Sequence, residues 1–425
     1  MPGERAATDV PTASSRTSTR DSFPALRYPQ YRVVWFGGLI AFFAVAGQSL
    51  ARAWLARKLT GTNAGLGGVN LGFGVSMLIA TPWGGVVADR LSKRTVLMCS
   101  MALLTINSAL IGAAVAFDFL HYWMLIAASA LQALAFSFYA PARMAFIAEL
   151  VDRPALSNAI VLGQMSSEGM RVIGPALAGV LIGTAQFGAA GVFLAGAALC
   201  LLATFSTLWL PPGYPAASAG RRSPRYEMLD GLRYLRADPR LRRLAWSSLG
   251  VVIIGFPYQA FLASIAVELF DVGAGSYGLL SAVTAIGAVI AGFFTARHAA
   301  RIDPWRVLVG AGFGFGVAVA LLGIAPNFGL ELLVLGFVGA TGLAFQTTNQ
   351  SLMLSLSDAT YHGRLQSVVM LGFGGFGIVA LPLGMLADAA GLRETLVVMG
   401  AGVVLTMLVF MLTRPQQSRL GARRG

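Results

Sequence analysis

Long apolar stretches dominate this chain, and short polar segments separate them. A helix that crosses the hydrocarbon core of a bilayer needs roughly 20 mostly apolar residues. The chain has twelve stretches of this kind, at residues 33–55, 65–88, 96–117, 122–141, 157–183, 189–210, 244–268, 277–297, 307–325, 331–355, 366–387 and 395–413. The pattern therefore predicts an all-α membrane protein with twelve transmembrane helices.

A polar interruption in the middle of the chain, residues 211–243, divides these stretches into two sets of six. We expect two pseudo-symmetric six-helix bundles, over residues 28–210 and 244–413. The end segments are polar, so residues 1–27 are predicted to form a disordered cytoplasmic tail and residues 414–425 a basic cytoplasmic tail.

The interruption itself contains apolar residues at helical spacing: Met228, Leu229, Leu232 and Leu235. This spacing predicts a short amphipathic helix. Such a helix can lie on the inner leaflet, where its arginines meet anionic headgroups. It can equally be an unattached linker helix, and the sequence leaves both alternatives open.

Composition and charge agree with a membrane protein. Hydrophobic residues make up 56% of the chain and charged residues 12%, about half the ~25% of soluble domains. The net charge is +13, and five of the 31 Lys and Arg residues lie away from the tails and predicted cytoplasmic loops: Arg52, Arg57, Lys58, Arg171 and Arg393. This asymmetry predicts a multi-pass protein of the cell membrane with both termini cytoplasmic, in contact with lipid and not with nucleic acid.

The segment between the second and third apolar stretches reads G-V-V-A-D-R-L-S-K-R over residues 85–94. It resembles the loop between helices 2 and 3 of the major facilitator superfamily, G-x-x-x-D-R-x-G-R-R, with Ser92 and Lys93 as departures. The resemblance implies a secondary transporter in which Asp89 lies against the start of helix 11. The gating motif expected on this basis comprises Gly85, Asp89, Arg90, Lys93, Arg94, Arg143 and Arg364.

The end of the eighth stretch, residues 292–297, is a looser copy of the segment from Gly85 to Arg90. The position of the aspartate is taken by Ala296, which cannot accept a hydrogen bond through its side chain. We therefore expect any carboxylate latch between the halves to be one-sided.

Three further stretches narrow the resemblance: residues 139–159, residues 231–239 and His362-Gly363-Arg364. They are similar to the enterobactin-exporter and macrolide-efflux branch of the superfamily. That likeness implies export of a small amphipathic molecule, such as a drug or siderophore, by proton antiport. The expected partners are the substrate, protons and membrane lipids. We expect the proton gradient to supply the energy, no cofactor to be needed, and the protein to be a monomer.

Glu168 and Arg171 are ionisable residues inside the fifth apolar stretch. They lie about 15 and 20 Å from Asn158 along a helix that rises 1.5 Å per residue, which is near the middle of a bilayer. Ionisable groups at that depth usually face a cavity, and a spacing of three lets the two pair. Glu168 is therefore a proton-coupling candidate, with a self-neutralising structural pair as the alternative.

The same stretch contains Gly174, Pro175 and Gly179, similar to the G-P-x-x-G-G motif of antiporter helices. Small residues also let helices approach closely in lipid, so packing alone is an alternative reading. In this superfamily helices 1, 4, 7 and 10 surround the central cavity. The substrate-cavity candidates on these helices are Gln48, Arg52, Gln132, Phe136, Tyr258, Gln259, Gln346 and Asn349.

Several other functions are disfavoured by the sequence. The three histidines lie at separate span ends and Cys99 and Cys200 lie in separate apolar runs, so we expect no enzyme, no metal site and no disulfide. Residues 372–377 fit G-x-G-x-x-G, but inside an apolar span this pattern indicates helix packing rather than a dinucleotide site. A proton-independent facilitator, an importer, a lipid transporter and, less favoured, a transport-inactive sensor remain as alternatives.

Overall fold

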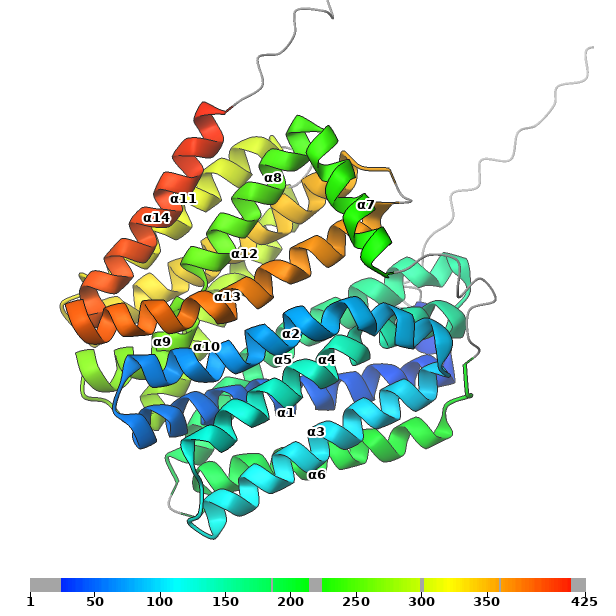
Figure 1. Ribbon diagram of the computed structural model, residues 1–425, viewed down its shortest axis with the longest axis horizontal. Coiled ribbons are helices and arrows are strands. Elements are labelled where there is room, and N and C mark those ends of the chain that lie inside the picture. The colour runs from blue at the N-terminus through cyan, green and yellow to red at the C-terminus, as the bar shows by residue number, and fades with distance from the viewer. Residues whose placement is uncertain (1–23, 185, 214–223, 299–301, 359–360, 414–425) are drawn as a thin grey trace, which may run out of the picture.

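The computed structural model describes residues 24–184, 186–213, 224–298, 302–358 and 361–413. Within these ranges the side chains of some helical residues, including Asp89, Glu168 and Arg364, lie outside the described set. The described residues form helices and contain no β-strand (Figure 1). Residues 1–23 of the predicted N-terminal tail, the predicted C-terminal tail and residues 214–223 of the linker fall outside this description. Pro24–Arg27, however, form a short 3-10 helix in which Ala25 is buried and donates its backbone N–H to the Oδ1 of Asn158 at 3.3 Å, so the prediction of disorder is wrong for these residues.

The first half of the chain forms six long helices: α1 Pro29–Thr60, α2 Asn63–Arg90, α3 Lys93–Ala116, α4 Tyr122–Leu150, α5 Arg153–Ile182 and α6 Gly188–Ser206. The tight turn between α1 and α2 shows why they end where they do. Gly61 adopts the left-handed conformation, with φ of 66°, and ends α1. The side chain of Thr62 then accepts the backbone N–H of Gly65 at 3.1 Å and caps α2.

The second half comprises α7 Pro224–Ala237, α8 Pro239–Gly250, α9 Tyr258–Ser264, α10 Ala274–His298, α11 Pro304–Leu322, α12 Phe328–Ser355, α13 His362–Ala390 and α14 Leu392–Leu412. Helices α8 and α9 belong to one segment, Pro239–Leu269, which contains π-helical turns at Val251–Gly255 and Ile265–Leu269. Pro257 lies between α8 and α9 and has no N–H to donate, so the regular helical ladder is interrupted there.

Each of the twelve predicted apolar stretches corresponds to a helical segment. Within the part of the chain that the structure describes, ten of these segments are long and apolar enough to cross a membrane. The other two, α5 and α13, are not among the ten. Large side chains such as Ile290 and Phe293 of α10 are exposed, as expected for surfaces that face lipid.

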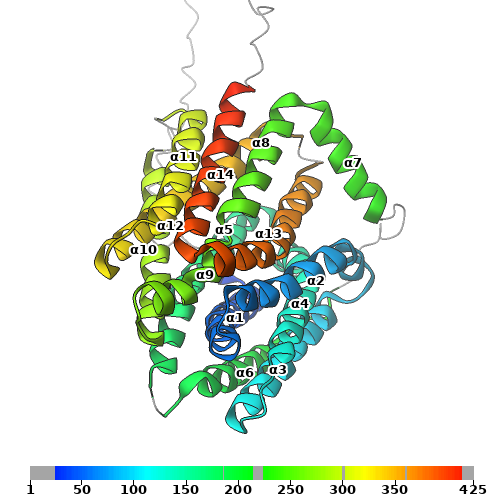
Figure 2. The ribbon, with the colours of Figure 1, turned by 60° about the vertical axis from the view of Figure 1, so that its left-hand side comes forward.

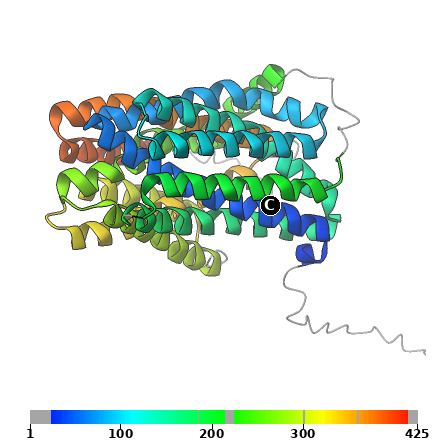
Figure 3. The ribbon, with the colours of Figure 1, turned by 90° about the horizontal axis from the view of Figure 1, so that it is seen from below.

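The helices run close to one common direction (Figure 3). Helices α3 and α6 lie at one edge of the molecule and α11 and α14 at the opposite edge, with α2 and α13 side by side between them (Figures 1 and 2). We call the end next to α7 the linker end. The end where residues 60–64 join α1 to α2 is the far end.

Helices α2 and α13 are antiparallel and touch through glycines. A Cβ atom added at Gly74 would lie 2.6 Å from the carbonyl oxygen of Gly374, and one added at Gly384 would lie 2.5 Å from that of Asn63. Gly377 also faces Gly74. The glycine-rich run at residues 372–377 therefore serves close helix packing, as predicted from the sequence.

Helix α5 is held between α1 and α10 by the glycines singled out in the sequence. A Cβ at Gly174 would lie 2.8 Å from the carbonyl oxygen of Phe43 in α1. On the other side, a Cβ at Gly278 of α10 would lie 2.8 Å from the Cα of Gly179. Both glycines thus make packing contacts, which is the simpler of the two readings of this motif.

Helix α7 confirms the helix predicted in the linker and packs against the second half. Its Leu235 is buried in the apolar core. The ring of Tyr234 stacks on that of Tyr361 with centroids 4.0 Å apart, and the Tyr234 hydroxyl accepts the backbone N–H of Asp358 at 3.1 Å. The helix is therefore attached to the protein at the junction of α12 and α13.

Candidate functional site

A cavity of about 570 Å³ lies between helices from the two halves of the chain. Helices α1, α2, α4 and α5 contribute to it from the first half, and α9 to α13 from the second. Six phenylalanines make up much of its apolar wall: Phe42, Phe73, Phe136, Phe256, Phe315 and Phe376. Small-molecule sites typically have this size and this largely apolar lining.

Most of the candidates named from the sequence line this cavity. They are Arg52, Gln132, Phe136, Arg171, Tyr258, Gln259 and Gln346, together with Pro175 of the helix 5 motif. The sequence reading missed Ser49 and Ser129, which also line it. A usable signal exists, because each serine lies three residues before a predicted cavity residue, Arg52 or Gln132. Residues three apart in a helix lie on the same face.

Two predicted cavity residues lie elsewhere, and those two predictions are corrected. Gln48 is buried and accepts a hydrogen bond from the Ser108 hydroxyl at 2.8 Å, which joins α1 to α3. The amide of Asn349 donates to the carbonyl of Leu244 at 3.1 Å and to the Ser247 hydroxyl at 3.3 Å, which joins α12 to α8. Each of these side chains makes an interhelical hydrogen bond, although the Nε2 of Gln48 is buried without a hydrogen-bond partner among the described residues.

Arg52 is the most deeply buried cation of the cavity wall, with a relative exposure of 3%. Its Nη2 donates to the Oε1 of Gln132 and, at 3.3 Å, to the Ser49 hydroxyl. Its Nη1 is buried and makes no hydrogen bond to any described residue. The guanidinium is thus held by two neutral groups.

Arg171 lines the same cavity from α5. Glu168 lies one helical turn away in α5, toward the linker end, and its side chain is outside the described residues. The pairing predicted for Glu168 and Arg171 therefore stays a prediction. Arg171 itself makes an interaction within the protein.

The cations that follow Asp89 hold the first half together. Lys93 is buried at the start of α3, and its Nζ lies 2.5 Å from the Oε1 of Glu149 at the end of α4. The guanidinium of Arg94 donates to the carbonyl of Leu210 at 3.1 Å. Arg90 is exposed at the end of α2. Lys93 and Arg94 therefore anchor α3 to α4 and to the end of α6.

Arg143 lies between α1 and α5, with its guanidinium next to Gly38 and Gly163. It also sits over the ring of Phe42, 5.5 Å from the centroid. The predicted latch involves the side chains of Asp89 and Arg364, which are outside the described residues. The burial of Gly85 is not described either. The latch at the linker end therefore remains a prediction.

At the far end, carboxylates connect the two halves. Asp388 of α13 accepts the backbone N–H of Asn63 at 2.7 Å and of Ala64 at 2.8 Å, which caps the start of α2. Glu268 lies 3.1 Å from Nη2 of Arg57 and accepts the side-chain amide of Asn63, also at 3.1 Å. We call these contacts the far-end latch.

Sequence reasoning missed this latch, because only the end of the eighth apolar stretch was compared with the end of the second. Residues 85–89 at the end of α2 read G-V-V-A-D, and residues 384–388 near the end of α13 read G-M-L-A-D. The shared G-x-x-A-D pattern was the available signal. The expectation of a one-sided latch, drawn from Ala296, concerns the linker end, where the side chains of Asp89 and Ala296 lie outside the described residues, so it stays a prediction.

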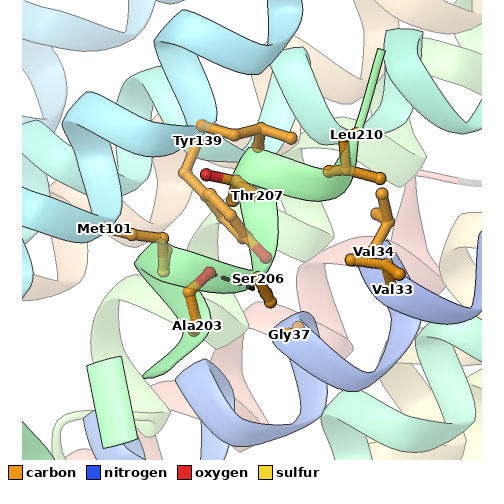
Figure 4. A pocket seen from close by; sticks show the side chains of 11 residues that line it. Val33, Val34, Gly37, Met101, Tyr139, Ala203, Ser206, Thr207 and Leu210 are labelled. Carbon is orange, nitrogen blue, oxygen red and sulfur yellow. Dashed lines mark hydrogen bonds between the residues drawn. The ribbon is translucent and has the colours of Figure 1, made fainter. Parts of the chain in front are cut away.

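A second pocket lies within the first half, lined by Tyr139, Ser206 and Thr207 among others (Figure 4). Its volume of about 20 Å³ has room for water and not for a substrate. The Ser206 hydroxyl points along its own helix and donates to the carbonyl of Ala203 at 2.8 Å. The central cavity is therefore the better candidate site.

Comparison with known proteins gives a consistent picture. Residues 20–420 match the family model described as transmembrane secretion effector. The chain is 24% identical to the staphyloferrin A transporter of Staphylococcus aureus, over 84% of this chain and 89% of that protein. It is also 24% identical to the enterobactin exporter EntS of Escherichia coli O1:K1, over 81% of this chain and 83% of that protein.

Solved structures with the same fold include a bacterial homologue of the human lysosomal transporter Spinster in an inward-facing conformation, with a TM-score of 0.74, 15% identity and coverage of 92% of this chain and 97% of that one. The nucleoside transporter NupG matches with a TM-score of 0.68, 14% identity and coverage of 91% and 99%. All four of these proteins are transporters. Because the family model spans nearly the whole chain, the protein belongs to the transmembrane secretion effector family, within the major facilitator superfamily of membrane transporters.

Proposed function

We propose that the protein is a proton-coupled exporter that exchanges protons for a small amphipathic molecule by alternating access. The single observation that carries this is the central cavity, which both halves line, in a molecule whose halves are joined at one end by the far-end latch. A site between two halves that rock against each other opens to one side at a time.

In this proposal α5 and α13 also cross the membrane, which gives twelve spans in two six-helix bundles, residues 28–210 and 244–413. The distribution of Lys and Arg supports a location in the cell membrane with both termini in the cytoplasm. The far end then faces outward and the linker end inward. The transporter acts as a monomer and needs no cofactor.

The substrate that suits this cavity has a large apolar surface and a few polar groups. Phenylalanine rings offer apolar contact, and Gln132, Gln259 and Gln346 offer hydrogen-bond partners. The relatives are a staphyloferrin A transporter and an enterobactin exporter. A molecule of siderophore type is therefore the class we propose for this chain.

Proton coupling is assigned to Glu168, with Arg171 as its partner. Arg171 and Pro175 bring α5 to the cavity wall, and Glu168 is one turn from Arg171. A carboxylate there can release its proton when substrate arrives and take up another after the cavity has opened to the other side. Binding of proton and substrate is then mutually exclusive, as antiport requires.

One observation favours a second candidate function, a proton-independent facilitator. None of the described residues that line the cavity is an aspartate or a glutamate. If the side chain of Glu168 points away from the cavity, no carboxylate is left there to carry the proton.

The test uses everted membrane vesicles with an acidified lumen, in which the lumen corresponds to the outside of the cell. Siderophores, dyes and macrolides are added one at a time, and loss of the pH gradient is followed with a fluorescent indicator. We expect one compound class to discharge the gradient with the wild type and not with Glu168→Gln. Transport of a labelled compound that is unaffected by an uncoupler would instead establish the facilitator.

A further inference from the structure

We infer that the transported molecule carries an anionic group, and that Arg52 binds this group in the central cavity. The inference rests on the proposed function, because it specifies the chemistry of the substrate in the same cavity. It does not depend on proton coupling or on the direction of transport.

The first argument is that no described residue supplies a counter-charge to Arg52. The side chain is 3% exposed, and its two described hydrogen-bond acceptors, Gln132 and Ser49, are neutral. In the described ranges, the recorded ion pairs join other residues: Arg57 to Glu268, Lys93 to Glu149, and Arg306 to Asp303. A buried cation without a counter-charge is costly, so an arginine at this depth indicates a negative partner from outside the chain.

The second argument is the geometry of the guanidinium. Nη2 is engaged on one side, whereas Nη1 is buried and has no described acceptor. The cavity is the open space next to Arg52. A planar oxyanion such as a carboxylate matches the fork of donors that an arginine presents. An anion bound in the cavity beside Arg52 supplies the missing charge, and it supplies an acceptor to those donors of the guanidinium that it reaches.

The third argument is the surroundings of this cation. Phe136 lies one helical turn from Gln132 on α4, and its ring centroid is 5.7 Å from that of Phe42. An apolar or aromatic body can pack on this pair while its acidic group reaches Arg52. No acidic side chain among the described wall residues competes for the guanidinium. Arg52 therefore selects for charge and the phenylalanines for bulk.

The test measures binding of three matched probes to the purified full-length protein in lipid nanodiscs, by calorimetry against empty nanodiscs. The probes are pyrenebutyrate, pyrenebutanol and a pyrenebutyl trimethylammonium ion, which share one aromatic body and differ in charge. We expect the wild type to bind the acid about tenfold more tightly than the alcohol, and the cation most weakly. In Arg52→Gln the acid should lose about tenfold and the alcohol less than twofold.

Two further variants separate recognition from structure. Arg52→Lys keeps the charge but not the fork of donors, so it should keep a weaker preference for the acid. Arg393→Gln removes a guanidinium that donates to the carbonyls of Gly323 and Ala325, outside the cavity, and should leave the preference unchanged. Equal losses for acid and alcohol in Arg52→Gln would mean that Arg52 only ties α1 to α4, and would overturn the inference.

The vesicle assay keeps this inference separate from the proposed function. A compound that is transported without any preference for anions overturns the role of Arg52 and leaves the exporter in place. Anion-selective binding that disappears in Arg52→Gln, in a protein that moves no substrate across vesicles, supports the binding site and counts against transport.

Discussion

The carboxylate of Asp388 accepts the backbone N–H of Asn63 at 2.7 Å, across the boundary between the two halves of the chain. Its second oxygen accepts the N–H of Ala64 at 2.8 Å. The first N–H groups of a helix have no partner within that helix, and its N-terminus carries partial positive charge. A residue of α13 thus caps α2, and in the proposed transport cycle the start of α2 would lose this partner when the far end opens.

We predict that Asp388→Asn opens the far end more often. An amide has one acceptor oxygen and no charge, so it replaces one of the two hydrogen bonds and little of the dipole interaction. The readout is the alkylation rate of Ala285→Cys in the cavity wall, in a background without Cys99 and Cys200, with a membrane-impermeant maleimide added from the far side. Loss of a cap costs about 0.5–2 kcal/mol, so we expect a rise of roughly tenfold.

The matched control for this prediction is Asp118→Asn. Asp118 lies in the turn after α3 at the same end of the molecule, and is exposed there. This variant should alkylate at the wild-type rate. Equal rates for Asp388→Asn and the wild type would show that the cap does not hold the far end closed.

Glu268→Gln should have a smaller effect than Asp388→Asn. The Arg57–Glu268 pair is partly exposed, with side-chain exposures of 15% and 33%. Ion pairs of this kind contribute about 0–1 kcal/mol, so we expect less than a fivefold rise in the same alkylation rate. A double-mutant cycle with Arg57→Gln isolates the pair. A larger effect than that of Asp388→Asn would reverse the ranking of the two contacts.

Gly74→Ala should weaken the packing of α2 on α13. Its Cβ would lie 2.6 Å from the carbonyl oxygen of Gly374. The Cβ is fixed to the backbone of α2 and the oxygen belongs to the backbone of α13, so neither atom can move away without its helix. Overpacking of this kind costs about 1–3 kcal/mol. We expect a lower midpoint of thermal unfolding in detergent. Gly310→Ala is the control, since nothing lies within 4 Å of its added Cβ, and an equal loss in both variants would contradict the packing argument.

Glu168→Gln should abolish transport driven by a proton gradient while exchange of labelled for unlabelled substrate persists. The amide cannot release a proton, so the step that couples the gradient to movement is lost. The rocking of the halves with substrate bound needs no such step. Uphill transport at the wild-type rate, at equal membrane abundance, would remove Glu168 from the coupling mechanism and leave it a structural role.

Apolar runs located the helices because length and hydropathy are properties of one segment at a time. Contacts between segments were harder to infer. Gln48 and Gln132 look alike in sequence, as amides inside apolar helices, yet Gln48 bonds Ser108 whereas Gln132 faces the cavity beside Arg52. The direction of a side chain depends on which helices surround it, and one sequence does not contain that information.

The missed latch has a different cause. Asp388 can be identified in the sequence as a carboxylate near the end of an apolar stretch. Its role, however, depends on α2 and α13 lying antiparallel, so that the end of one helix meets the start of the other. The eighth predicted span, which is α10, was compared with α2 because it occupies the same place in its half of the chain. The latch instead joins α2 to α13, which packs against it.

The glycine contact between α2 and α13 sets how small a movement is needed to release that latch. Gly74 is eleven residues from Asn63, and at a rise of 1.5 Å per residue this is a lever arm of about 16 Å. A tilt of about 10° about the glycines therefore displaces the start of α2 by about 3 Å. Hydrogen bonds weaken steeply beyond their usual length, so in the proposed transport cycle a rotation of this size would separate the Asp388 carboxylate from both amides at once, and the far end would have two positions, latched and released.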